Sequence, residues 1–166
     1  MKDLNTRIHP LADVKTSHIG KGTHVWQFAI ILEGAVIGEN CNINCHTFIE
    51  SKTIIGDRVT VKSGIYLWDG IEIGNDVFLG PNVTFINDKY PRSKRYPKNY
   101  QNTRIDEFAS IGAAATILGG VHIGRYALIG AGSLVTKDVP AYALVIGNPG
   151  RVVGTVDSVG HVIERF

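Results

Sequence analysis

The chain has 166 residues, a formal net charge of +2, and a composition of 44% hydrophobic and 19% charged residues. This length suits one domain with its own core, and the composition is globular rather than disordered or collagen-like. The small charge argues against bulk binding to nucleic acid or an anionic membrane. The sequence has no leader-like segment and no run of 18 apolar residues, so we expect a single cytoplasmic domain over residues 1–166.

A six-residue period runs along the first half of the chain. Apolar residues occupy every sixth position twelve times in succession: Ile19, Val25, Ile31, Ile37, Ile43, Ile49, Ile55, Val61, Leu67, Ile73, Leu79 and Phe85. Small or β-branched residues such as Ala29 and Val59 follow four places later and are also expected to face inward. Six is not a multiple of 3.6, so a helix would scatter these side chains, whereas short strands joined by tight turns keep them in line.

The period therefore predicts an all-β fold, a parallel β-helix of about seven coils, with 18 residues in each triangular coil. Glycine often follows the aliphatic position, as at Gly38 and Gly56. There we expect a backbone conformation that a side chain would penalise.

One insertion interrupts the period. The frame returns at Ile105, 20 residues after Phe85, so the segment from about Asp88 to Arg104 is predicted to leave the coils as a loop. This segment carries six basic residues and three tyrosines against a single acid. A basic, aromatic loop of this kind can hold phosphates and stack on a base. Two further coils follow it, and residues 155–166 form a short tail whose conformation the pattern leaves open.

No metal site is expected. Cys41 and Cys45 are spaced C-x3-C without a second cysteine pair, and we interpret both as reduced. His18 and His24 lie six positions apart, which does not match the close pair of the zinc-dependent enzymes that share this type of repeat.

The repeats, together with GPNVTFIND before the loop and VPAYALVIGNPGRVVG near the end, resemble the hexapeptide-repeat acetyltransferases from Ile8 to Gly154. The resemblance implies a left-handed β-helix, a homotrimer, and acetyl-CoA as co-substrate in the groove between neighbouring subunits.

The segment from Trp68 to Lys94 resembles the 3-N-acetyltransferases that act on dTDP-linked 3-amino-3,6-dideoxyhexoses in cell-surface polysaccharide synthesis. It resembles more loosely the enzymes that act on UDP-3-amino sugars of the 2-acetamido-3-amino-glucuronate type, so the nucleotide stays open. A non-catalytic trimeric binding protein is the alternative from another class.

The loop departs from the acetyltransferases that modify hydroxyl groups. Those enzymes carry a catalytic His-Pro there, whereas this chain has Tyr90-Pro91. An alcohol needs a base to remove its proton, but an amine with a pKa of about 8 is already partly neutral and nucleophilic. The departure therefore favours an amino sugar as the acceptor.

Residues 18 apart stack in such a fold, so Asp69 and Asn87 are predicted to lie in one column that leads up to the loop. We expect Asn87 to contact the sugar amine and Asp69 to attract its ammonium form. His46 is a third catalytic candidate, in a column where the small Gly64 would leave room for a ligand. The proposed substrate-binding residues, from the loop and from the resemblance, are Glu50, Trp68, Tyr90, Arg92 and Lys94.

For CoA, the resemblance points to the last coils. Small residues there would let the pantetheine arm lie close to the backbone, and two basic residues would meet the phosphates. The residues are Gly112, Ala113, Gly130 and Ala131 for the arm, and Lys137 and Arg151 for the phosphates.

Overall fold

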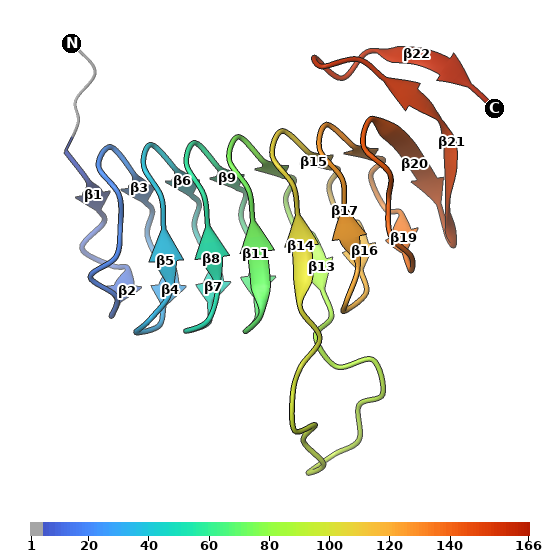
Figure 1. The fold of residues 1–166 in the computed structure, drawn as a ribbon. Helices are drawn as coiled ribbons and strands as arrows, with labels where there is room; N and C mark the ends of the chain where they lie inside the picture. The colour runs from blue at the N-terminus through green and yellow to red at the C-terminus, as the bar shows by residue number, and fades with distance from the viewer. Residues whose placement is uncertain (1–4) are drawn as a thin grey trace.

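The computed structural model describes residues 5–166, which form an all-β solenoid of about eight turns with no helix. Three parallel sheets make the sides of a triangular prism (Figure 1). The predicted all-β coil is confirmed, with about one more turn than expected.

Sheet A contains β1 (Arg7–Ile8), β3 (His24–Val25), β6 (Asn42–Ile43), β9 (Thr60–Val61), β12 (Phe78–Leu79), β15 (Ser110–Ile111), β18 (Leu128–Ile129), β20 (Ala143–Gly147), β21 (Gly150–Val156) and β22 (Val162–Arg165). Sheet B contains β2 (Asp13–Val14), β4 (Ile30–Ile31), β7 (Phe48–Ile49), β10 (Tyr66–Leu67), β13 (Thr84–Phe85), β16 (Thr116–Ile117) and β19 (Leu134–Val135). Sheet C contains β5 (Val36–Ile37), β8 (Ile54–Ile55), β11 (Ile71–Ile73), β14 (Thr103–Ile105) and β17 (His122–Ile123).

The winding is left-handed. In Figure 1 the strands of sheet C rise on the near side, and the chain passes over the top and returns behind as it advances to the right. Residues 18 apart are paired in parallel, as Ile31 is with Ile49 and Ile49 with Leu67. This register confirms the coil length predicted from the sequence.

The periodic apolar residues line the inside of the prism. All twelve of the first run are buried except Ile19, which is partly buried on the first coils. The small residues four places later, such as Ala29 and Val59, are buried as well. Burying each large aliphatic side chain contributes about 1.5–3 kcal/mol, so the column of stacked residues is the core of the fold.

The glycines that follow the aliphatic positions are needed for a reason different from the predicted one. Neither Gly38 nor Gly56 has a positive φ angle. Instead, a Cβ atom on Gly38 would lie 2.5 Å from the carbonyl carbon of Gly56 on the next coil. The positive φ angles come two residues later, at Asn40 (54°) and Arg58 (56°). These glycines therefore allow one coil to approach the next.

The inserted loop spans residues 88–101, because the chain rejoins the solenoid earlier than expected. Thr103 is buried and begins β14, where it pairs with Ile71, and Arg104 pairs with Glu72. The expected boundary at residue 104 was therefore wrong by three residues. The loop leaves from the corner between sheets B and C and projects away from the prism (Figure 1).

The C-terminal residues continue sheet A. β20, β21 and β22 pair in antiparallel fashion, so half of the predicted tail at 155–166 consists of the end of β21 and the strand β22. Residues 5–166 contain no helix, and therefore no helix that could span a membrane.

A charged cluster joins two coils on the outer face of sheet C. The Asp106 carboxylate accepts a hydrogen bond from Arg104 Nε at 2.9 Å and lies 2.8 Å from His122 Nε2. Partial burial raises the pKa of Asp106, but the hydrogen bonds from His122 and Arg104 outweigh it, and the pKa lies below its ordinary value. Asp106 occupies a position that is glycine in the neighbouring coils, at Gly74 and Gly124.

We predict that Gly38→Ala lowers the free energy of unfolding by about 1–3 kcal/mol, because the added Cβ meets backbone that cannot move aside. Gly132→Ala is the matched control: it has open space, and Ala114 already occupies the same column with a φ of 56°. Gly132 has a φ of 69°, which costs a side chain about 1–2 kcal/mol, so urea unfolding should show a smaller loss for the control than for Gly38→Ala. Equal losses in the two variants would contradict the stacking explanation.

We also predict that Asp106→Asn reduces the acid sensitivity of the fold. A carboxyl whose pKa is lowered on folding contributes stability above its unfolded pKa, and this stability is lost as the pH falls through the folded value. The wild type should therefore lose more unfolding free energy than the variant below about pH 4. Urea unfolding measured at several pH values down to about 2 tests this, and parallel curves would contradict it.

Candidate functional site

The loop base and Asp69 form a hollow at the corner between sheets B and C. We call this the loop hollow; it is lined by Lys52, Asp69, Gly70, Lys98, Asn99, Tyr100 and Asn102. The structure thus brings Asp69 together with a basic and an aromatic side chain of the loop. Asn87 lies on the coil that follows that of Asp69, at the point where the loop begins. Its carbonyl oxygen accepts a 3.5 Å hydrogen bond from the Gln101 N–H. Its side chain is not among the lining groups.

Asp69 is held by bonds to the coil below. Its backbone N–H donates to Glu50 Oε2 at 2.7 Å, and its Oδ1 accepts from the Lys52 N–H at 2.9 Å. Trp68, the residue before it, donates its indole N–H to the Phe85 carbonyl oxygen at 2.7 Å. The indole N–H is therefore occupied, and Trp68 can offer a ligand mainly its ring.

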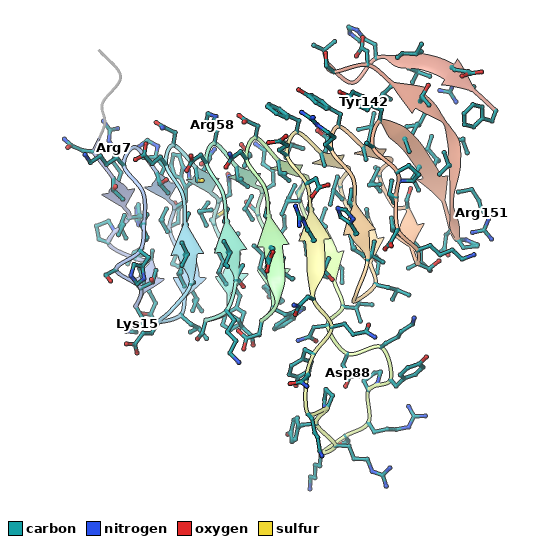
Figure 2. All side chains as sticks on the ribbon, in the orientation of Figure 1. Arg7, Lys15, Arg58, Asp88, Tyr142 and Arg151 are labelled. Carbon is teal, nitrogen blue, oxygen red and sulfur yellow. The ribbon has the colours of Figure 1, made fainter. Side chains whose placement is uncertain are left out.

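The loop side chains proposed to bind substrate stand in solvent. Tyr90 is 78% exposed, and Arg92 and Lys94 are exposed as well. Within residues 5–166, none of the five basic side chains of the loop forms an ion pair, although Arg92 donates to the neighbouring Pro91 carbonyl. Figure 2 shows the side chains of the loop, near the labelled Asp88, spread away from the prism. Their charges are available to an anionic ligand.

His46 lies at a different corner, between sheets A and B. Its ring stacks on Phe28 with centroids 5.2 Å apart. The room expected above Gly64 is absent, because the side chain of Asn82 occupies the place where a Gly64 Cβ would be. His46 is not among the residues that line the loop hollow.

The outer face of sheet B carries an aromatic cluster that was not predicted from the sequence. Phe48, Tyr66 and Trp68 have ring centroids 5.9–6.2 Å apart in edge-on or tilted arrangements. Phe48 and Tyr66 are 18 residues apart and face outward, and this spacing could have revealed the pair. Lys52, Asn99 and Asn102 were missed at the loop hollow, because the path of an irregular loop does not follow from the period.

The small residues proposed for the pantetheine arm lie at the corner between sheets A and B. A Cβ on Gly112 would be 2.5 Å from the Ala131 nitrogen, so coil stacking alone requires that glycine. At Gly130 a Cβ would meet the Ile146 side chain at 3.1 Å, which is less restrictive. Ala113 is partly exposed and Ala131 is exposed, so their surfaces are accessible.

Lys137 and Arg151 line one hollow near the C-terminal end of the prism, together with Thr136, Asp138, Gly150 and Val152 among others. We call this the C-terminal hollow. Arg151 projects into solvent at that end (Figure 2), and its Nη1 donates to the Gly150 carbonyl at 2.9 Å. The two cations that were selected from separate segments are therefore neighbours, with free donors for an anion. Among the described residues no group of three or more His, Cys, Asp and Glu side chains suits a metal ion.

The chain is similar to known transferases with hexapeptide repeats. The family model described as bacterial transferase hexapeptide (six repeats) matches residues 16–51 and 102–137. A dTDP-3-amino-3,6-dideoxy-α-D-galactopyranose 3-N-acetyltransferase from Aneurinibacillus thermoaerophilus is 55% identical over 149 residues. The match covers 90% of this chain and 78% of that protein.

Solved structures of the same architecture include a hexapeptide-repeat acetyltransferase, VCA0836, from Vibrio cholerae O1 biovar eltor in complex with acetyl-CoA. It has a TM-score of 0.59 at 25% identity, and the match covers 82% of this chain and 72% of that one. PerB from Caulobacter crescentus, in complex with CoA and GDP-perosamine, has a TM-score of 0.57 at 24% identity, which supports the fold alone. The match covers 92% of this chain but 58% of PerB.

The left-handed coil, the 18-residue register and the 55% identity over most of both proteins agree with one another. The chain belongs to the hexapeptide-repeat acyltransferase family.

Proposed function

We propose that this protein transfers the acetyl group of acetyl-CoA to the 3-amino group of a dTDP-linked 3-amino-3,6-dideoxyhexose. The observation that carries this proposal is the 55% identity to a 3-N-acetyltransferase of that class over 149 residues. The loop hollow supports it, since it offers a carboxylate for an ammonium group beneath a loop rich in cations. The product would serve cell-surface polysaccharide synthesis.

In this proposal Asp69 attracts the ammonium form of the sugar amine, and Asn87, one coil above, orients it by hydrogen bonding. The ammonium group first gives up one proton to solvent, and the neutral amine then attacks the thioester carbonyl carbon. The C–N bond forms, the C–S bond breaks, and the proton released from nitrogen passes to the departing thiolate of CoA. Positioning supplies most of the catalysis, because an amine needs no strong base. His46 would assist only if a neighbouring subunit brings its corner close.

The loop would hold the diphosphate of the nucleotide through Arg92 and Lys94, with Tyr90 available to stack on the base. Glu50 would support the sugar pocket from the coil before that of Asp69, and Trp68 from the same coil as Asp69. For acetyl-CoA, the proposed contacts are Ala113, Ala131 and their neighbouring glycines along the arm, and Lys137 and Arg151 at the phosphates.

We further propose a homotrimer with active sites between subunits. The loop stands away from its own prism and exposes Tyr90 and Tyr96 at 78% and 82%. Exposed aromatic side chains on a projecting loop are suited to cover a site that a second subunit helps to form.

The proposal predicts release of CoA thiol when the protein is mixed with acetyl-CoA and dTDP-3-amino-3,6-dideoxygalactose. The assay should include the corresponding glucose isomer and a UDP-3-amino sugar as parallel acceptors. We expect the highest kcat/KM with a dTDP sugar. Release with the UDP sugar alone would move the assignment to that substrate class, and no release with any amino sugar would contradict the function.

For the cofactor side, we predict that the double variant Lys137→Ala, Arg151→Ala raises the KM for acetyl-CoA roughly 2- to 30-fold, because each exposed ion pair contributes about 0.2–1 kcal/mol. The KM for the amino sugar should stay unchanged, and the effect should shrink at high salt. Lys21→Ala, which removes an exposed cation at the other end of the prism, is the control. An unchanged KM for acetyl-CoA in the double variant would place the CoA phosphates elsewhere.

A further inference from the structure

Glu50 is an acidic residue in a column of stacked residues that are mostly apolar. The residues that stack with it at the end of each sheet B strand are the exposed Lys15 and then Leu32, Trp68, Ile86, Leu118 and Thr136. Trp68 and Leu118 pack against the hydrophobic core from this position. Glu50 is itself partly buried. A carboxylate in a half-buried position that elsewhere is mostly apolar is costly unless its oxygens are bonded.

The Glu50 carboxylate is bonded to the backbone that carries Asp69. Glu50 Oε2 accepts the Asp69 N–H at 2.7 Å, while Asp69 Oδ1 accepts the Lys52 N–H at 2.9 Å from the opposite direction. Two side chains thus each satisfy a backbone N–H of the other coil. We call this reciprocal pair of bonds the corner bracket. It fixes both the main chain and the carboxylate of Asp69.

The two acids of the bracket differ in what they face. Asp69 lines the loop hollow, together with Lys98 and Tyr100 of the loop, whereas Glu50 does not. One oxygen of Asp69 is used within the bracket, which leaves Oδ2 for a ligand.

We propose that Glu50 is a positioning residue, which acts on the amino sugar through Asp69 rather than by contact. This inference rests on the proposed function, because it takes Asp69 as the group that binds the sugar ammonium. Without Glu50 the Asp69 N–H would lose its partner in a half-buried corner, and the main chain would shift to find another. The Asp69 carboxylate would then leave the place where it meets the ammonium group.

Two substitutions separate positioning from contact. Glu50→Ala removes the acceptor, whereas Glu50→Gln keeps a side-chain oxygen that can accept the same N–H without a charge. A residue that acts by accepting this bond tolerates glutamine. A residue whose charge attracts the substrate does not.

The chain also offers a matched control at another corner. Asp57 Oδ1 accepts the Glu39 N–H at 2.8 Å, which is the same kind of bond between coils, at the corner between sheets C and A. Neither residue lines the loop hollow. Asp57→Ala therefore reports the effect of losing such a bond where no substrate is proposed.

The experiment measures steady-state kinetics with both substrates and amide hydrogen exchange of the unliganded protein around residue 69. For Glu50→Ala we expect the KM for the amino sugar to rise about 10-fold, the KM for acetyl-CoA to stay unchanged, and the Asp69 amide to exchange faster. Glu50→Gln should restore the KM to within about 3-fold of wild type and restore protection. Asp57→Ala should leave both KM values unchanged.

Equal damage from Glu50→Gln and Glu50→Ala, with the Asp69 amide still protected in the glutamine variant, would overturn the proposal and assign Glu50 a direct contact. So would an unchanged Asp69 amide in Glu50→Ala. Failure of the proposed function is seen separately, as a wild-type protein inactive with every amino sugar while its Asp69 amide is still protected by Glu50.

Discussion

Backbone hydrogen bonds between strands that pair in an 18-residue register join each coil to the next, and the rest of the structure depends on the close spacing that these bonds impose. The N–H of Glu50 bonds to the carbonyl of Leu67 and the N–H of Leu32 to that of Ile49, each at 2.9 Å. At this spacing some corners have no room for a Cβ atom, so glycine is required there. A side chain that is long enough can reach the main chain of the adjoining coil, and Glu50 and Asp69 do so.

The loop is compatible with this stacking because it enters and leaves at one corner. Thr84 pairs with Thr116, 32 positions later instead of 18, and the 14 extra residues lie outside the prism. The coils on either side of the loop remain in register, so Asp69 lies on the coil that precedes the start of the loop and lines the hollow at its base. A rigid solenoid thus presents an irregular, basic loop at a defined position, which is the arrangement expected of a binding site built on an insertion.

The six-residue period was sufficient to predict the inward residues, the coil length and the column that contains Asp69 and Asn87, because each depends only on spacing. The role of Gly38 and Gly56 was not predicted, since close approach between coils is a three-dimensional property. The prediction of free space at Gly64 was wrong for the same reason: the side chain of Asn82, 18 residues later, occupies that space.

The Asp106 cluster and the corner bracket depend on side-chain conformation, so the six-residue period of the sequence does not predict them. The grouping of Lys137 with Arg151 arises from the antiparallel turn between β20 and β21, which lies outside the repeat.

We propose that coil stacking holds the Asp69 carboxylate in the loop hollow, in position to bind the amine of the acceptor sugar. A crystal structure of the protein with CoA and dTDP-3-amino-3,6-dideoxygalactose tests it most directly. We expect the sugar nitrogen within hydrogen-bond distance of Asp69 Oδ2, with cationic side chains of residues 88–101 in contact with the diphosphate. A sugar bound with its nitrogen at the corner of His46, and with the loop hollow empty, would contradict it.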